Sequence, residues 1–459
     1  MTAPIQTDVA IIGAGTAGIG AFAELGKLGL SRLLIDHGPL GTTCARVGCM
    51  PSKAVLHAGA QWATLRTLLN GAEPPAGAQR PIDLWRHARA TRDMLAGNTA
   101  KRTQSAAGDD LLMGRARFVG PSTLDVDGRR VEAKAVIVAT GSGPVVPGFL
   151  KALGERVLTT DTLFDLDELP ASVGMLGLGA IGLEMGLALS RLGVRVVAGD
   201  MKALPAGITD PEVGQAAIAR FAPELTMWLG QPMQAKADGK RITVSAGDGR
   251  SETVDMVLAA LGRSPNLDGL DLAAAGVPLD DKGRPQLSDD GLRAGDAPVV
   301  FAGDVNGVRP LMHEAVDEGL LSARLAAHIV DGRAIERPQR RVPLAIVFSD
   351  PDIGAVGMAH DQLDAGSTVI GTAKGSANGR AQVLGAPDDL IRVYADARSG
   401  RLLGASLITS HGEHLSHLLA WAIQRGETAQ QLLELPYYHP TLEELLQSAL
   451  KDVARQVKG

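Results

Sequence analysis

The chain has little cysteine, no long apolar run and no basic block. Two cysteines occur in 459 residues, and the net charge is −6. Because no cluster of Lys or Arg could follow a phosphate backbone, we expect no nucleic-acid partner. The apolar runs are broken by glycine or charge well below the ~20 residues that span a bilayer, and the start of the chain lacks the positive region of a signal peptide. The sequence therefore predicts no membrane contact and a cytoplasmic protein.

The shortage of cysteine also argues against a metal site. Zinc takes four protein ligands, or three and a water, and the two cysteines have no second pair elsewhere in the chain,. His411, His414 and His417 recur at every third position, but residues three apart drift around a helix and no further ligand accompanies them. We expect no metal.

Cys44 and Cys49 lie five positions apart in the stretch that runs from Gly41 to Lys53. An undistorted helix would separate their Cα atoms by about 7.5 Å, which is beyond the usual reach of a disulfide. Gly48 permits the chain to bend there, so a strained and therefore reducible disulfide is geometrically plausible. The alternative is two buried cysteines that never meet.

A glycine motif follows the first apolar stretch. Asp8 to Ile12 predicts a buried strand, Gly13, Gly15 and Gly18 follow it, and an Ala- and Leu-rich helix extends to about Leu28. The glycines would let the backbone approach a pyrophosphate at the helix N-terminus. The next predicted strand ends at Asp36, where a carboxylate can accept hydrogen bonds from a ribose.

The same pattern occurs a second time, with Gly177, Gly179 and Gly182. Gly18 to Gly29 and Gly182 to Gly193 both span eleven residues, and Asp36 and Asp200 each follow seven residues later. We therefore predict two dinucleotide sites. FAD and a nicotinamide dinucleotide are the expected pair, because a dithiol exchanges two electrons and needs a flavin to meet a hydride carrier. Asp200 favours NAD over NADP, although Gly199 could displace the acid from the strand end and Lys202 could meet a phosphate.

The remaining segments predict the domain order. A strand ends at Thr140-Gly141 before a Pro-rich linker, a second exit runs from Leu258 to Asn266, and Val299 to Asp304 reads as a strand that ends in an acid. A junction rich in Pro and Arg begins at Arg337. We predict an α/β protein with two Rossmann-like dinucleotide-binding domains and a C-terminal α+β dimerisation domain. The bounds are 1–150 (FAD, first part), 151–266 (NAD(P)), 267–340 (FAD, returning part) and 341–459 (interface).

Seven motifs, GAGTAG, CARVGCMPSK, ATG, GLGAIGLE, ALGRSPN, AGD and HPTLEE, resemble in order and spacing those of the flavin-dependent pyridine nucleotide–disulfide oxidoreductases. This is the family of dihydrolipoamide dehydrogenase, glutathione reductase and mercuric reductase, and the resemblance spans nearly the whole chain. It implies a homodimer that pairs through the last domain. Pro51-Ser52-Lys53 looks like the dihydrolipoamide dehydrogenase version, because glutathione reductases tend to carry Lys-Lys after the proline.

The resemblance implies roles for individual residues. Cys44 would be the interchange thiol, Cys49 the charge-transfer thiol against the flavin, and Lys53 would pair with Glu184 beside the flavin. His439, oriented by Glu444, would act as acid and base in the partner subunit's site, while Thr441 caps the following helix. The predicted cofactor-binding residues are Gly13, Gly15, Gly18, Asp36, Thr43, Lys53, Thr140, Gly141, Gly303, Asp304, Ala315, Gly177, Gly179, Gly182, Asp200 and Gly262.

Three positions depart from the family pattern: Thr42 replaces a glycine, Arg46 an asparagine, and Tyr437 a histidine. Arg46 would either stabilise a thiolate and attract an acidic disulfide, or lie solvated on the loop. Three functions stay open. The first is oxidation of a lipoyl dithiol, either as a small molecule or on a lipoyl domain. The others are reduction of another low-molecular-weight disulfide, and service chiefly as a docked subunit of a 2-oxoacid dehydrogenase complex.

Overall fold

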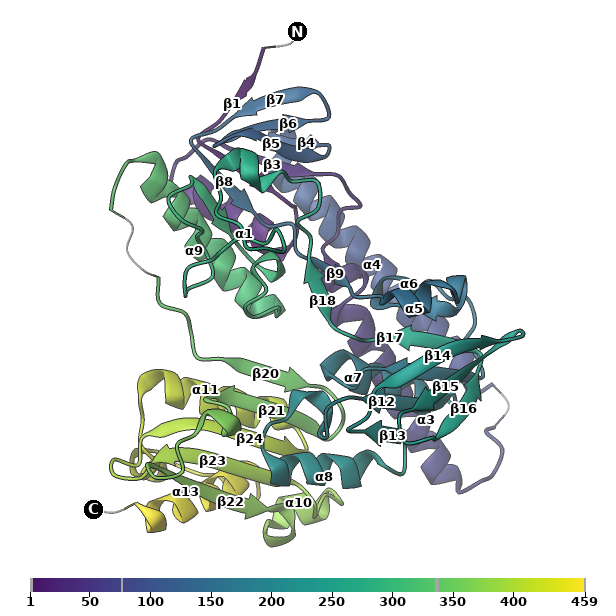
Figure 1. The fold of residues 1–459 in the computed structure, drawn as a ribbon. Helices are drawn as coiled ribbons and strands as arrows, with labels where there is room; N and C mark the ends of the chain where they lie inside the picture. The colour runs from purple at the N-terminus through teal and green to yellow at the C-terminus, as the bar shows by residue number, and fades with distance from the viewer. Residues whose placement is uncertain (1–2, 76, 335–337, 458–459) are drawn as a thin grey trace.

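The computed structural model describes residues 3–75, 77–334 and 338–457. Arg337, the first residue of the predicted junction, and the first two and last two residues of the chain lie outside these ranges. The described chain forms three units, each built on a five-stranded sheet. In Figure 1 the first unit lies at the top, the second at the right and the C-terminal unit at the bottom. Mixed parallel and antiparallel sheets with covering helices give the predicted α/β class.

The first unit has a parallel sheet with the strand order β19-β8-β2-β3-β4. Its strands are β2 (Val9–Ile12), β3 (Arg32–Asp36), β4 (Leu111–Met113), β8 (Ala135–Val138) and β19 (Val299–Phe301). Alternate side chains of β2 enter two different cores. Val9 and Ile11 pack beneath α1 (Thr16–Lys27) and α9 (Met312–Val330), whereas Ala10 and Ile12 pack against the small sheet described below. A strand buried on both faces explains the continuous apolar run.

The sheet of the first unit is completed by a segment that follows the second unit in sequence. Val299 pairs with Val136 in parallel register, so β19 extends the sheet beside β8. Helix α9, from the same segment, packs along α1. The small sheet, in the order β1-β7-β6-β5, covers the opposite face; its strands are β1 (Ile5–Gln6), β5 (Ala116–Gly120), β6 (Thr123–Val126) and β7 (Arg129–Glu132).

The second unit repeats this parallel sheet in the order β10-β17-β11-β12-β13. Its strands are β10 (Val157–Leu158), β11 (Ser172–Leu176), β12 (Arg195–Asp200), β13 (Thr226–Leu229) and β17 (Met256–Ala259). Helices α7 (Ala180–Arg191) and α8 (Pro211–Phe221) accompany them, with an antiparallel sheet of β14 (Met233–Asp238), β15 (Arg241–Ala246) and β16 (Ser251–Val254).

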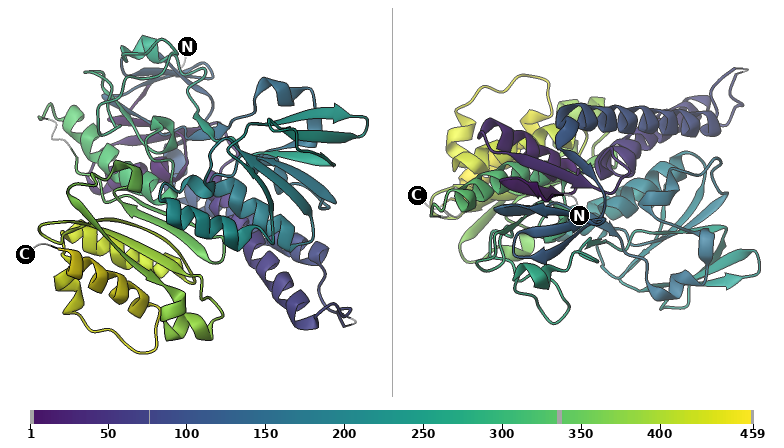
Figure 2. Two further views of the ribbon diagram at one scale, coloured as in Figure 1. Left: turned by 60° about the horizontal axis from the view of Figure 1, so that its bottom comes forward. Right: turned by 90° about the horizontal axis from the view of Figure 1, so that it is seen from above.

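Two long helices of the first unit reach toward the second unit. Helices α3 (Cys49–Leu69) and α4 (Pro81–Ala107) pack together, and α3 also packs against α7. Figure 2 shows this pair projecting past the second unit. The short elements are α2 (Thr43–Arg46), β9 (Ser142–Pro144), α5 (Gly148–Lys151), α6 (Thr160–Leu163) and β18 (Arg263–Pro265). Because α3 begins at Cys49, this packing carries one end of the cysteine stretch to the boundary between the units.

The C-terminal unit has an antiparallel sheet in the order β20-β21-β24-β23-β22. The strands are β20 (Leu344–Val347), β21 (Asp352–Gly357), β22 (Thr368–Lys374), β23 (Leu390–Asp396) and β24 (Leu402–Thr409); the helices are α10 (Gly379–Val383), α11 (Gly412–Arg425), α12 (Ala429–Leu433) and α13 (Glu443–Gln456). Buried Asp210 of α8's N-cap receives hydrogen bonds from Arg392 Nε (2.8 Å) and the Tyr394 hydroxyl (2.7 Å), which fixes the second unit to the C-terminal sheet.

No helix within residues 3–75, 77–334 and 338–457 is both long enough and apolar enough to cross a membrane.

Candidate active site

The chain bends between the two cysteines, as the sequence predicts. Helix α2 ends at Arg46, and α3 begins at Cys49 after Gly48, whose φ and ψ are −120° and −118°. A Cβ atom on Gly48 would lie 3.0 Å from the Thr43 carbonyl oxygen and 3.2 Å from the Cys44 Cα, so the close approach of the two cysteines requires glycine,. Both thiols are free in this structure, and they lie close enough for a hydrogen bond to join them.

The two thiols differ in acidity. The hydrogen bond from the Cys44 thiol and the nearby Lys53 ammonium together lower the pKa of Cys49 to about 7, against the opposing effect of burial. The same hydrogen bond, together with burial, raises the pKa of Cys44. Near neutral pH Cys49 is therefore the thiol of the pair that ionises more readily, and Cys44 the one that holds its proton,.

Lys53 and Glu184 are in contact. The Lys53 ammonium lies 2.9 Å from both oxygens of Glu184, which is buried in the first turns of α7. The ammonium also lies 4.5 Å from the centre of the Phe348 ring, and the Phe348 amide donates to Glu184 at 3.0 Å. The pair thus joins α3, the second unit and the C-terminal unit one helical turn from Cys49.

A cavity of about 250 Å³ lies in front of the cysteines, between the first and second units. Apolar residues such as Phe164 and Ile181 form part of its wall, beside the cysteines and the charged pair. The predicted site residues that line it are Gly15, Thr43, Cys44, Cys49, Lys53, Gly141, Glu184, Gly303, Asp304 and Ala315. Residues from five distant parts of the chain therefore meet around one space.

The first glycine motif is packed so tightly that side chains are excluded. A Cβ on Gly13, which has φ +110°, would lie 2.3 Å from the Ala139 carbonyl oxygen, and one on Gly18 would lie 1.8 Å from the Gly13 carbonyl oxygen. Gly15 caps α1 without a side-chain hydrogen bond. Gly15, Thr16 and Ala17, at the N-terminus of α1, line the cavity, an arrangement that suits a pyrophosphate,.

The second motif has the same construction. A Cβ on Gly177 would lie 2.4 Å from the Ala260 carbonyl oxygen, and one on Gly182 would lie 2.0 Å from the Gly177 carbonyl oxygen. Together with Gly179, these glycines lie outside the lining of the dithiol cavity. The second motif therefore belongs to a separate region of the second unit.

The two predicted ribose acids occupy equivalent positions. Asp36 accepts hydrogen bonds from the amides of Ala14 (2.7 Å) and Gly38 (2.6 Å). Asp200 accepts them from Leu178 (2.7 Å) and Lys202 (2.8 Å). Strand β12 continues through Asp200, so the possible displacement of this acid by Gly199 does not occur.

Thr140 and Gly262 are among the predicted cofactor residues that do not line the dithiol cavity, whereas Arg263 and Ser142, which were not predicted, do line it. The Thr140 hydroxyl donates to the Asn266 carbonyl at 2.7 Å, and Gly262 lies outside the lining. Arg263 and Ser142, which sequence reasoning missed, form a chain instead. Arg263 Nε donates to Ser142 Oγ, and Ser142 Oγ donates to Asp304 Oδ2, both at 2.8 Å. The signal was present, since Arg263 lies within the motif ALGRSPN.

His439 and Glu444 form the predicted pair, away from the cysteines of their own chain. His439 Nδ1 lies 3.0 Å and 3.1 Å from the two Glu444 oxygens, and this contact lowers the pKa of Glu444. The His439 side chain is 78% exposed. The predicted cap by Thr441 is wrong: α13 has Leu442 at its N-cap, and the Thr441 hydroxyl donates to the Tyr438 carbonyl, while its amide donates to Glu444.

Arg46 turns away from the dithiol. Its guanidinium contacts the Pro39 carbonyl oxygen at 3.5 Å, its methylenes pack near Gly41, and it is absent from the cavity wall. The sequence left two alternatives for Arg46, a charge that acts at the dithiol and a solvated position on the loop, and neither describes its position fully. Within residues 3–75, 77–334 and 338–457, no group of three or more His, Cys, Asp or Glu side chains is arranged to hold a metal ion. His411, His414 and His417 therefore form no such group either.

Comparison with known proteins agrees with this architecture. The profile of the pyridine nucleotide-disulphide oxidoreductases matches residues 7–319, and the profile of their dimerisation domain matches residues 343–450. A dihydrolipoyl dehydrogenase of Halobacterium salinarum is 34% identical, over 96% of this chain and 95% of its own length. One from Thermus scotoductus is 34% identical, over 98% of each chain. LpdA from Mycobacterium tuberculosis has the same fold, with a TM-score of 0.83 at 23% identity, covering 97% of this chain and 99% of its own.

The fold and the dithiol thus define a two-dinucleotide disulfide oxidoreductase. The chain belongs to the pyridine nucleotide-disulphide oxidoreductases. Membership confirms the predicted enzyme class and FAD and NAD as the cofactors, and the C-terminal unit is the dimerisation domain of the family, as the homodimer prediction requires. Three features fit FAD and NAD: the glycine turns that would admit no Cβ, the N-terminus of α1, and the two acids at strand ends.

Proposed function

We propose that this protein is a dihydrolipoyl dehydrogenase, which oxidises a dihydrolipoyl dithiol and reduces NAD. The observation that carries the proposal is the pair of thiols in the wall of the cavity, with the pKa of Cys49 lowered to about 7 and that of Cys44 raised. Only a pair in which one sulfur leaves easily as a thiolate can exchange rapidly with a second dithiol at neutral pH.

The residues support a two-step exchange when the cysteines are joined as a disulfide. A substrate thiolate attacks the Cys44 sulfur, and Cys49 leaves as a thiolate that the Lys53 charge stabilises. The second substrate thiolate then attacks the substrate sulfur that is bonded to Cys44 in the mixed disulfide. This attack closes the substrate disulfide and releases Cys44. Two electrons and two protons leave the substrate. FAD, when bound, supplies the two-electron relay from the dithiol to NAD.

Protons need a carrier in this exchange. We assign this role to His439, held by Glu444, and we assign it in trans, because His439 is exposed and does not line the cavity of its own chain. The interface unit of the partner would bring it to Cys44. Lys53 and Glu184 position charge one turn from Cys49, where a cation stabilises negative charge that develops on reduction,.

The cofactor residues follow from the two glycine turns. We propose that Gly13, Gly15, Gly18, Asp36, Thr43, Gly141, Gly303, Asp304 and Ala315 hold FAD, with the Thr140–Asn266 contact behind them. Gly177, Gly179, Gly182, Asp200 and Gly262 would hold NAD. The bounds 1–150, 151–266, 267–340 and 341–459 remain our proposed domains; the pairing of β19 with β8 supports the return of the third segment to the first unit.

The position of Arg46 favours an uncharged substrate. An acidic disulfide such as that of glutathione would need a free cation near the interchange sulfur, but Arg46 contacts the Pro39 carbonyl oxygen outside the cavity wall. The cations that do line the cavity, Lys53 and Arg263, are bonded to Glu184 and to Ser142. A lipoyl group presents an apolar chain and no carboxylate in its amide form. As a dihydrolipoyl dehydrogenase, the homodimer would work in the cytoplasm and dock without a covalent link into a 2-oxoacid dehydrogenase complex.

The test is a matrix of rates with NAD and NADP against dihydrolipoamide, reduced glutathione and related dithiols. We expect dihydrolipoamide with NAD to give the highest kcat/KM, and Cys44→Ser and Cys49→Ser to abolish it. A higher kcat/KM for a different dithiol would overturn the substrate assignment. Co-purification of acyltransferase subunits would support the docked role, and a fully active dimer that binds none of them would contradict it.

A further inference from the structure

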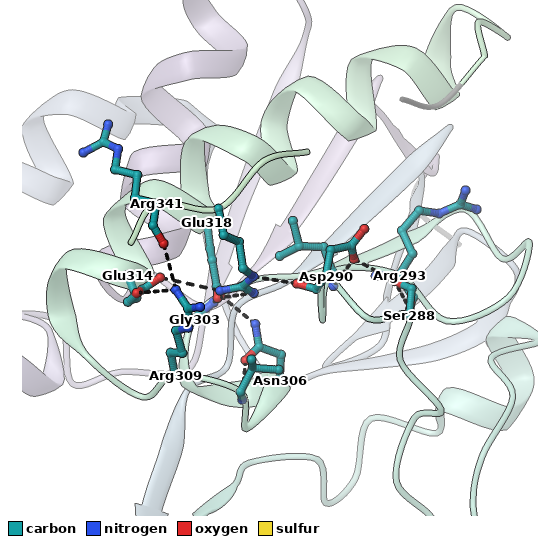
Figure 3. Close-up of polar contacts among 12 residues, drawn as sticks. Ser288, Asp290, Arg293, Gly303, Asn306, Arg309, Glu314, Glu318 and Arg341 are labelled. Atoms are coloured by element: carbon teal, nitrogen blue, oxygen red, sulfur yellow. Dashed lines mark hydrogen bonds and ion pairs between the residues drawn. The ribbon is translucent and has the colours of Figure 1, made fainter. Parts of the chain in front are cut away.

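A network of buried charges lies behind the loop that carries Gly303 and Asp304. Glu314 and Glu318 project from α9, and Arg309 approaches Glu314 from the segment before that helix (Figure 3). Arg340, from the segment after the helix, pairs with both carboxylates. The two carboxylates are 4% and 1% exposed. The mechanism above uses neither of them, and charges this deeply buried are retained only where other groups compensate for their desolvation.

Glu318 holds the loop by its backbone. Its Oε2 accepts hydrogen bonds of 2.6 Å from the Gly303 amide and of 2.6 Å from the Asn306 side chain. Gly303 has φ +78°, and a Cβ there would lie 3.1 Å from the Ala17 Cβ and 3.5 Å from the Ala315 Cβ. The loop is therefore pressed between α1 and α9, and its amide is already bonded to Glu318.

Arg340 neutralises Glu318. Its Nη2 lies 2.6 Å from Glu318 Oε1, and its Nη1 lies 3.6 Å from Glu314 Oε2. These contacts are ion pairs without the alignment of hydrogen bonds, whereas Nε donates to the Asp290 carbonyl at 2.8 Å. Burial raises the pKa of Glu318, and the Arg340 charge and the Gly303 amide oppose that rise. Without Arg340, Glu318 would not keep the negative charge that strengthens its hydrogen bonds to the loop.

The front of the same loop faces the cavity. Gly303 and Asp304 line it, and Asp304 receives the hydrogen bond from Ser142 that continues to Arg263. The loop therefore lies between the Glu318 carboxylate on one side and, on the other, the cavity that we assign to FAD.

We propose that Glu318 is a positioning residue for FAD: it fixes the Gly303–Asp304 loop against the cofactor, and Arg340 acts through Glu318 as its counter-ion. The inference rests on the proposed function only in taking Gly303 and Asp304 as FAD contacts. It adds two residues that touch neither the cavity nor the dithiol, one of them in the segment that leads into the C-terminal unit.

The test follows FAD release from diluted holoenzyme by the rise in flavin fluorescence. Glu318→Gln should release FAD about 10- to 100-fold faster, the factor expected for loss of a hydrogen bond to a charged group. Arg340→Gln should also accelerate release, and Arg340→Lys, which keeps the charge, should restore most of the retention. Arg341→Gln is the matched control: that side chain is 73% exposed, pairs with Asp317 at 3.2 Å, and should release FAD at the wild-type rate.

A variant with both substitutions distinguishes the positioning of the loop from a general loss of protein stability. If Arg340 acts through Glu318, the variant with both Glu318→Gln and Arg340→Gln should release FAD no faster than Glu318→Gln alone, whereas independent structural damage would add. Wild-type release rates in Glu318→Gln, or additive effects in the double variant, would overturn the inference. If Glu318→Gln does not fold, Arg340→Gln decides, and unchanged release there refutes the proposal. A wild-type protein without flavin would refute the proposed function itself.

Discussion

Thr42 stores backbone strain immediately before the first cysteine helix. Its φ is +57° and its ψ is 148°, a region that a β-branched residue rarely adopts,. Such a residue costs about 1–3 kcal/mol. In partial compensation, the Thr42 hydroxyl caps α2 by accepting a hydrogen bond from the Ala45 amide at 3.2 Å. Strain destabilises the folded protein and the cap stabilises it, so substitutions of Thr42 can separate the two contributions.

We expect Thr42→Gly to stabilise the protein and Thr42→Ala to destabilise it. Glycine removes the strain, loses only a few tenths of a kcal/mol as a cap, and costs about 0.5–1 kcal/mol in chain entropy, which leaves a gain of about 1 kcal/mol. Alanine keeps the strain and loses the cap, at about 0.5–2 kcal/mol. The resemblance to a family that usually has glycine here agrees with the direction.

The assay compares the apparent melting temperatures of the three proteins under identical conditions. Because a chain of several domains need not unfold in one step, the order of the three values is the reliable result. Thr42→Gly should melt highest and Thr42→Ala lowest. Thr42→Gly below wild type would show that the hydroxyl outweighs the strain, and the reasoning from φ would then be refuted. Asn70→Gly is the control, since Asn70 at φ +45° is a residue that tolerates this region,.

Three further predictions concern the chemistry. In reduced enzyme, alkylation of Cys49 should accelerate as pH rises through about 7, and Cys44→Ala should move that midpoint upward because the hydrogen bond that lowers the pKa is lost. Asp200→Ala should narrow the preference for NADH over NADPH in steady-state rates, and a wild-type preference for NADPH would contradict the NAD assignment. His439→Gln should slow dithiol turnover by roughly 10²–10⁴-fold while NADH still reduces the flavin, and mixed dimers with Cys44→Ser protomers should regain activity.

Local patterns predicted the features that depend on nearby residues. The glycine motifs are followed by helices at the expected positions, and the repeat spacing placed Asp36 and Asp200 at equivalent strand ends. Gly48 favours the bend between α2 and α3, because a Cβ there would lie only 3.0 Å from the Thr43 carbonyl oxygen. In each case the physical cause lies within a few dozen residues of sequence.

Contacts between distant segments were harder to predict. Ser142 and Asp304 are 162 residues apart in sequence but lie 2.8 Å apart, and nothing in either neighbourhood predicts that bond. Thr441 illustrates the opposite case. The spacing Thr-x-x-Glu predicted a cap, but Glu444 bonds to His439 as well as to the Thr441 amide, and the hydroxyl points to Tyr438. A second partner for Glu444 changed a local outcome that the motif alone favoured.

The arrangement of the charged pair bears on our proposal that a second copy of the chain completes the active site. Glu184 is held by Lys53 of the first unit and by the Phe348 amide of the C-terminal unit, so one carboxylate fixes all three units around the cysteines. In the chain's own cavity, however, Ile346 is the C-terminal unit's contribution to the described lining. The exposed His439 belongs to the same unit as Phe348, and it does not line this cavity. This geometry supports our proposal that the acid and base for the dithiol come from the dimerisation domain of a partner.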